Sequence, residues 1–136
     1  KSPGRINLIG EHIDYSGGHV LPAAIYRKVT LMLRKNSTAV CHIKSKDGGA
    51  FSFDINKPLQ ISKTHWENYV LGVVDGVLKA RSGQLSGFEC DISSDLPIGA
   101  GISSSAALEC GLAKGLNALF DLNLDDLELI EISRMA

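Results

Sequence analysis

The sequence lacks several features that would point to particular classes of protein. It contains no apolar run approaching the length of a membrane span, and no signal-peptide pattern opens the chain. Its net charge of -1 at pH 7 gives no electrostatic reason to expect nucleic acid or an anionic membrane as a partner. These absences lead us to expect a cytoplasmic protein that binds neither nucleic acid nor membranes.

Cysteine is also scarce, since Cys41, Cys90 and Cys110 are odd in number, widely spaced and without a CxxC pair. We therefore expect buried, reduced thiols rather than disulfides or metal ligands. The 136 residues, 44% of them hydrophobic, suffice for one globular domain with a core. Lys1 stands where a start methionine would, and a helical pattern runs to Ala136, so we expect a piece of a longer protein.

The hydrophobic pattern predicts a mixed α+β domain. Period-two alternation predicts strands at 28–34, 39–44, 51–55 and 88–92. A turn at 46–49 favours an antiparallel meander of the first three. Ile6, Leu8 and Ile9 suit a further strand in the core. Because strands and helices mix without strict β-α-β alternation, α+β is the expected class, with a mostly antiparallel sheet.

Apolar residues three and four positions apart predict three helices. The first begins near Trp66, where Thr64 and Glu67 have the T-x-x-E form of a capping box. The second runs to about residue 120. The third is expected to be capped by Asn123.

The stretch 97–107, PIGAGISSSAA, predicts an anion-binding loop at the start of the second helix. The first amides of a helix lack intrahelical partners and lie at the positive end of its dipole. Glycines let a ligand approach these amides, and serine hydroxyls add donors, so phosphate is the expected ligand. One serine would suffice for capping alone. The residues assigned to phosphate binding are Gly99, Gly101, Ser103, Ser104 and Ser105.

Known phosphate and nucleophile loops do not fit this spacing. A Walker loop would need a lysine after Gly101, and a dinucleotide fingerprint would need glycine or alanine in place of Ser104. A G-x-S-x-G elbow would need glycine in place of Ser105. The loop is therefore of another design.

The stretch 3–22, PGRINLIGEHIDYSGGHVLP, contains polar residues that a core strand does not need. Carboxylates such as Glu11 and Asp14 accept hydrogen bonds from hydroxyls, and His12 adds a donor or acceptor, so a polyol or sugar is the expected ligand. A metal site stays open as the alternative, although no other Cys/His cluster completes a shell. Arg5 is either a surface ion-pair residue or, beside a phosphate donor, a group that neutralises transferring phosphoryl oxygens.

Both stretches resemble a known family. GRINLIGEHIDYSGG resembles the galactokinase signature, LPIGAGISSSAALE resembles the second motif of the GHMP kinases, and HWENYVLGVV resembles the segment between them. The resemblance spans essentially all 136 residues. It implies that residues 1–136 form most of a GHMP-kinase N-terminal domain, which binds sugar and ATP, with a mixed, mostly antiparallel sheet and helices packed on one side of it. It also implies that the C-terminal domain is absent from this chain.

The resemblance implies an ATP-dependent, Mg²⁺-requiring sugar-1-kinase that converts galactose to galactose 1-phosphate. It assigns γ-phosphate transfer to Arg5 and binding of the sugar hydroxyls to Glu11, His12 and Asp14. On the nucleotide side, it places Trp66 near the adenine and assigns Mg²⁺ to Ser105. The residues that it assigns to the ATP phosphates are Gly99, Gly101, Ser103, Ser104 and Ser105. Composition alone gives the other interpretation of Trp66, because a lone tryptophan on an amphipathic helix is more often a core residue. The resemblance also implies that the catalytic aspartate follows the second motif, beyond residue 136. Asp121, Asp125 and Asp126 lie in and around a helix start, where capping explains them.

Other functions stay open. N-acetylgalactosamine kinases and arabinose kinases share much of the signature, and some galactokinase-like proteins are non-catalytic sugar sensors. The yeast-type sensor loses a serine-alanine pair that is intact here at 103–107, which favours catalysis. Mevalonate and homoserine kinases share the serine loop without the GEHxDY residues. A serine hydrolase would need a histidine and an acid near Ser103 or Ser104.

Overall fold

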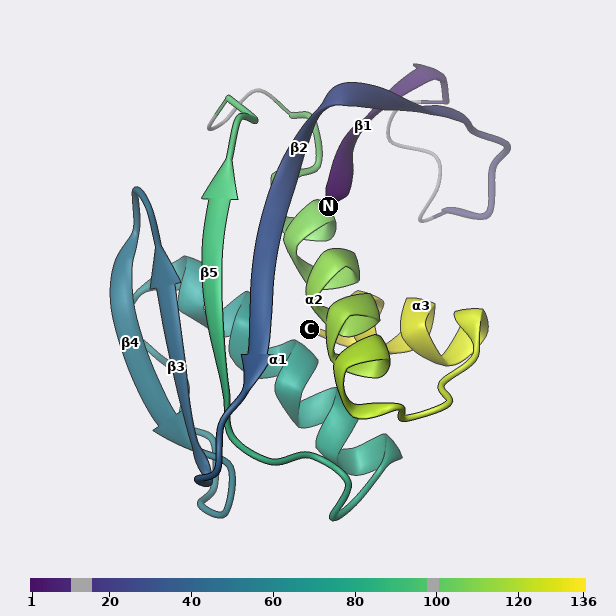
Figure 1. Cartoon of the computed structure of the whole chain (residues 1–136). Coiled ribbons are helices and arrows are strands. Elements are labelled where there is room, and N and C mark those ends of the chain that lie inside the picture. The colour runs from purple at the N-terminus through teal and green to yellow at the C-terminus, as the bar shows by residue number, and fades with distance from the viewer. Residues whose placement is uncertain (11–15, 98–100) are drawn as a thin grey trace.

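The computed structural model describes residues 1–10, 16–97 and 101–136. Within them, five strands form one sheet and three helices lie on one side of it (Figure 1). The strands are β1 (Ser2–Ile9), β2 (Leu21–Lys35), β3 (Val40–Ser45), β4 (Gly49–Asp54) and β5 (Phe88–Ser94). The helices are α1 (His65–Ala80), α2 (Ser104–Phe120) and α3 (Asp126–Met135). The predicted α+β class, with a mostly antiparallel sheet and helices on one side, is confirmed.

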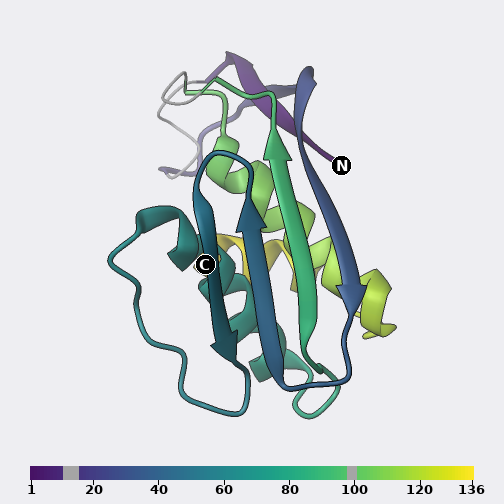
Figure 2. The ribbon, with the colours of Figure 1, turned by 60° about the vertical axis from the view of Figure 1, so that its left-hand side comes forward.

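The strand order is β1-β2-β5-β3-β4, and β5 is antiparallel to β2 but parallel to β3. Figure 2 shows β5 between β2 and the β3–β4 hairpin. The predicted meander is therefore wrong, because β2 and β3 do not pair. Asn36 N donates to Gly87 O and Gly87 N donates to Thr38 O, so the β2–β3 connection holds the start of β5 instead of closing a hairpin.

The core lies between the sheet and helices α1 and α2. Its fully buried side chains include Ile43, Phe88, Val70, Val73, Val74, Val77, Leu112 and Leu116. Burying an aliphatic side chain of this kind contributes about 1.5–3 kcal/mol. Cys41 and Cys90 are buried as predicted, whereas Cys110 is exposed. The prediction fails at Cys110 because it lies two positions from each of the buried Leu108 and Leu112 on α2, and two helical positions turn a side chain through about 200°, away from the core.

The capping box predicted at α1 is wrong. Thr64 is the N-cap residue, but its side chain makes no capping hydrogen bond. Ser62 Oγ instead donates to Glu67 Oε2 at 2.5 Å and accepts from Thr64 N at 3.1 Å. The Asn68 side chain donates to Ser62 O and accepts from Ser62 N, so Ser62 fastens the incoming chain to α1.

The cap of α3 is Asp125 rather than Asn123. Asp125 accepts from Glu128 N while Glu128 accepts from Asp125 N, which completes a capping box. Asn123 has a φ of 54° and its side chain donates to Asp121 O, so it belongs to the preceding turn. Arg81 at the end of α1 donates to both carboxylate oxygens of Glu128, which lowers the pKa of Glu128 and joins α1 to α3.

The first strand, β1, lies at the edge of the sheet. The prediction that its apolar residues lie in the core is wrong. Ile6, Leu8 and Ile9 are 38%, 60% and 70% exposed. Ile9 pairs with Leu21, which is 54% exposed, and Val20 beside it is 38% exposed. We call these five residues the β1–β2 tip. It extends beyond the layer that the helices cover (Figure 1).

Candidate functional site

The strand that carries the opening motif contacts the glycine-serine loop. Arg5 N donates to Ile102 O at 3.1 Å. A Cβ at the buried Gly4 would lie 2.5 Å from Leu96 Cδ2 and 3.0 Å from Ile102 O, so only glycine allows this approach. Sequence reasoning missed Gly4, although a glycine within a strand is a signal of close backbone contact. The exposed Arg5 side chain thus extends from a strand beside the loop.

The start of α2 has an unusual backbone. Gly101 has a φ of 67°, and Ser103, the N-cap residue, has φ 59° and ψ 45°. The left-handed region costs a non-glycine residue about 1–2 kcal/mol. Ser103 makes no side-chain capping bond, and the first turn of α2 carries no acidic residue. Among the described residues, the helix amides at this end therefore lack the side-chain cap and the negative charge that commonly satisfy them.

Four predicted site residues, Glu11, His12, Asp14 and Gly99, lie outside the described residues. The chain on either side of 11–15 is defined. Ile9 pairs with Leu21, and a Cβ at Gly10 would lie 2.6 Å from His19 O. Residues 9–10 therefore lie beside residues 19–21.

Trp66, Ser104 and Ser105 line one cavity of about 440 Å³. Its other lining residues are Val29, Ser45, Asp47, Gly48, Tyr69, Ile92, Ser94, Leu96 and Leu108. The structure thus brings together the tryptophan and two serines that are 38 and 39 positions away in the sequence. Sequence reasoning assigned 46–49 only to a turn, because nothing in its local pattern indicates that it packs near α2.

Trp66 is both a core residue and a cavity residue. Its Nε1 donates to Gly48 O at 3.2 Å, and its ring meets Phe51 edge to face with centroids 5.3 Å apart. The side chain is only partly buried. The remaining indole surface provides an apolar wall next to polar groups, as small-molecule sites require.

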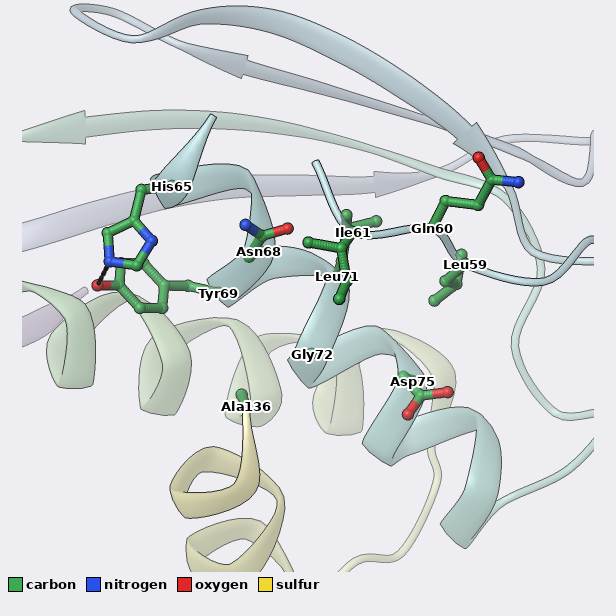
Figure 3. Close-up of a pocket in the computed structure, with 10 residues that line it drawn as sticks. All are labelled: Leu59, Gln60, Ile61, His65, Asn68, Tyr69, Leu71, Gly72, Asp75 and Ala136. Atoms are coloured by element: carbon green, nitrogen blue, oxygen red, sulfur yellow. Dashed lines mark hydrogen bonds between the residues drawn. The ribbon is translucent and has the colours of Figure 1, made fainter. Parts of the chain in front are cut away.

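A second cavity, of about 420 Å³, lies between segment 59–61 and α1 (Figure 3). At one end His65 Nε2 and Tyr69 Oη form a hydrogen bond of 3.3 Å. Tyr69 lines both cavities. The amide of Asn68 already bonds the backbone of Ser62. Since this cavity contains none of the predicted site residues, we place the candidate site in the first cavity.

The donor set of the first cavity suits a cation that arrives with a phosphate ligand. Within 1–10, 16–97 and 101–136, no group of three or more His, Cys, Asp or Glu side chains is arranged to hold a metal ion. Ser105 and Asp47 nevertheless offer oxygen donors. Mg²⁺ typically takes one or two protein oxygens and completes its shell with phosphates and water.

None of the helices within residues 1–10, 16–97 and 101–136 is long and apolar enough to cross a bilayer.

The described geometry is that of an α+β domain with a glycine-serine loop beside a cavity lined by Trp66, and comparison with known proteins gives its family. Residues 68–136 match the GHMP kinases N terminal domain, so the chain belongs to the GHMP kinase family. Residues 1–35 match the galactokinase galactose-binding signature.

Similar proteins agree with this assignment. The chain is 39% identical to a galactokinase from Thermotoga maritima and 43% identical to one from Staphylococcus carnosus, covering 37% and 35% of their lengths. These alignments include 100% and 98% of this chain. The chain thus spans little more than a third of these relatives.

Solved structures share the fold. A galactokinase from Lactococcus lactis complexed with galactose superposes with a TM-score of 0.88 at 38% identity, over 97% of this chain and 35% of that one. A mevalonate kinase from Methanococcus jannaschii superposes with a TM-score of 0.80 at 23% identity, over 98% of this chain and 44% of that one. The second likeness concerns the fold alone.

Proposed function

We propose that the full-length protein carrying this chain is a sugar-1-kinase that transfers the γ-phosphate of MgATP to the anomeric hydroxyl of galactose. The hydrogen bond from Arg5 N to Ile102 O carries the proposal. It joins the strand of the galactose-binding signature to the serine loop, and direct transfer requires donor and acceptor sites to be neighbours. On this proposal, residues 1–136 are most of the sugar- and ATP-binding N-terminal domain.

Each part of the site has one function in the transfer. The anomeric oxygen forms a bond to the γ-phosphorus while the bond from that phosphorus to the β,γ-bridging oxygen breaks and ADP leaves. The guanidinium of Arg5 neutralises charge on the transferring oxygens. The carboxylates of Glu11 and Asp14 accept hydrogen bonds from the sugar hydroxyls, and His12 donates or accepts one. The hydroxyl proton passes to a base that we do not assign within residues 1–136.

The serine loop holds the nucleotide phosphates. Amides at the start of α2 and the hydroxyls of Ser103, Ser104 and Ser105 face the anion, with Gly99 and Gly101 allowing close approach. We assign the surroundings of the adenine to Trp66, which lines the same cavity as Ser104 and Ser105. Ser105 is the ligand that we assign to Mg²⁺, which supplies positive charge against the β- and γ-phosphate oxygens when it is bound.

A coupled ADP-release assay on the full-length protein tests this function. Galactose, N-acetylgalactosamine, arabinose and mevalonate are offered in turn with MgATP, and galactose is expected to give the highest kcat/KM. Turnover of mevalonate without any sugar would contradict the proposal. Preference for N-acetylgalactosamine or arabinose would reassign the sugar, and binding of galactose and ATP without turnover would indicate a sensor.

A further inference from the structure

We infer that Gly48 is a positioning residue for nucleotide binding: the absence of a side chain there seats Trp66 against the β3–β4 turn and keeps the cavity open. The inference rests on the proposed function, because it takes this cavity as the ATP site. It concerns a residue that acts through Trp66 and does not itself take part in the transfer.

Position 48 requires glycine because the indole of Trp66 leaves no room for a side chain there, and not because the backbone adopts a positive φ. A Cβ on Gly48 would lie 2.9 Å from Trp66 Nε1, 3.0 Å from Trp66 Cε2 and 3.1 Å from Ser45 Oγ, closer than Cβ atoms normally approach other groups, and the two shortest contacts are with the indole. Its φ lies outside the positive range. The neighbouring Gly49 has the opposite requirement, with a φ of 89° and no atom within 4 Å of the place where its Cβ would lie. The two adjacent glycines therefore serve different purposes.

Three contacts determine where the indole lies. Trp66 Nε1 donates to Gly48 O at 3.2 Å, and Gly48 N donates to Ser45 Oγ at 3.2 Å, so the ring is tied to a turn that is itself held. Phe51 packs edge to face on the indole at 5.3 Å. Gly48, Trp66, Ser104 and Ser105 all line the same cavity.

A methyl group at position 48 has to displace the indole. Phe51 occupies one flank of the ring, and the turn occupies another, so the open direction is toward the cavity. Such a shift takes space from the base and breaks the bond to Gly48 O. The sugar-binding residues of the opening motif and the serine loop assigned to the ATP phosphates lie on other elements. The defect therefore falls on binding of the nucleotide base.

The test compares four variants of the full-length protein: Gly48→Ala, Gly49→Ala, Trp66→Phe and the double variant Gly48→Ala/Trp66→Phe. Gly48→Ala should raise the KM for ATP on the order of tenfold and leave kcat and the KM for galactose within about twofold. It should also shift the fluorine NMR signal of 5-fluorotryptophan at position 66, which is assigned by its loss in Trp66→Phe. Gly49→Ala is the matched control: it strains the turn but should leave that signal and the KM for ATP unchanged.

The double variant separates positioning from general damage. Phenylalanine lacks Nε1 and reaches less far, so Gly48→Ala should have little further effect in the Trp66→Phe background. An unchanged Trp66 signal and ATP KM in Gly48→Ala, or additive effects in the double variant, would overturn the inference while leaving the kinase intact. Failure of the unsubstituted protein to use ATP would instead refute the proposed function.

Discussion

At the scale of single residues, sugar binding and nucleotide binding are assigned to different side chains. Two substitutions therefore test the two assignments separately. Asp14→Ala removes a sugar acceptor and should weaken galactose binding by about 1–3 kcal/mol, with nucleotide affinity nearly unchanged. Ser105→Ala should do the reverse, because it removes a hydroxyl from the cavity that Trp66 lines. Calorimetric titration of galactose and of MgATP measures both affinities. Equal losses for both ligands in each variant would show that the two halves are misassigned.

The buried thiols give a stability that depends on pH. Burial raises the pKa of Cys41 to about 11 and that of Cys90 to about 12, from an ordinary value of 9.0. Below pH 9 both states keep these protons. Above it the unfolded chain releases them while the folded chain does not, so the free energy of unfolding should fall by about 1.4 kcal/mol per pH unit for each thiol.

Urea unfolding between pH 7 and 10.5 measures this slope. The variant Cys41→Ala/Cys90→Ala should lose the thiol contribution, whereas Cys110→Ser, which alters an exposed thiol, should keep it. A slope that is equal in the unsubstituted protein and the double variant would contradict the expected effect of burial.

At the scale of elements, the entry into α1 depends on Ser62 rather than on the residue that the sequence pattern indicates. Ser62→Ala removes the bond to Glu67 and leaves Thr64 N without its acceptor, so it should lower the free energy of unfolding by about 1 kcal/mol. Thr64→Ala is the matched control and should cost much less, because the Thr64 side chain makes no capping bond. Chemical denaturation compares the two, and a larger loss for Thr64→Ala would restore the T-x-x-E box.

Local patterns predicted most elements because alternation and helical spacing are properties of neighbouring residues. They did not predict that β5 enters the sheet between β2 and β3, since this depends on pairing between segments some 50 positions apart, as in the register of His42 with Glu89. The same limit applies to the site. The glycine-serine loop stands out from its own residues, but only tertiary packing brings Asp47 and Gly48 into the cavity that Ser104 and Ser105 line.

At the scale of the whole molecule, the β1–β2 tip leaves apolar side chains in solvent. Ile9 and Leu21 are paired across the two strands, and both are more than half exposed. Contiguous exposed apolar surface is typical of contact regions. The chain covers 37% of the length of a similar galactokinase, which leaves ample polypeptide in such a protein to cover this surface. We therefore expect residues 1–136 alone to self-associate, as measured by light scattering across a concentration series.

We also expect no galactose-dependent ADP release from residues 1–136 alone, and we expect the full-length protein to show it. A catalytic base must come within hydrogen-bond reach of the sugar hydroxyl. The aspartates around α3 are poor candidates, because Asp125 is engaged as a helix cap and Asp126 lies 3.5 Å from Lys114 Nζ. A site open to water on one side also weakens each charge contact. The coupled assay is run on both polypeptides at equal concentration, with ATP binding to the shorter one as the control for folding. Robust galactose-dependent turnover by the 136-residue chain would contradict this expectation and place the base among Asp121, Asp125 and Asp126.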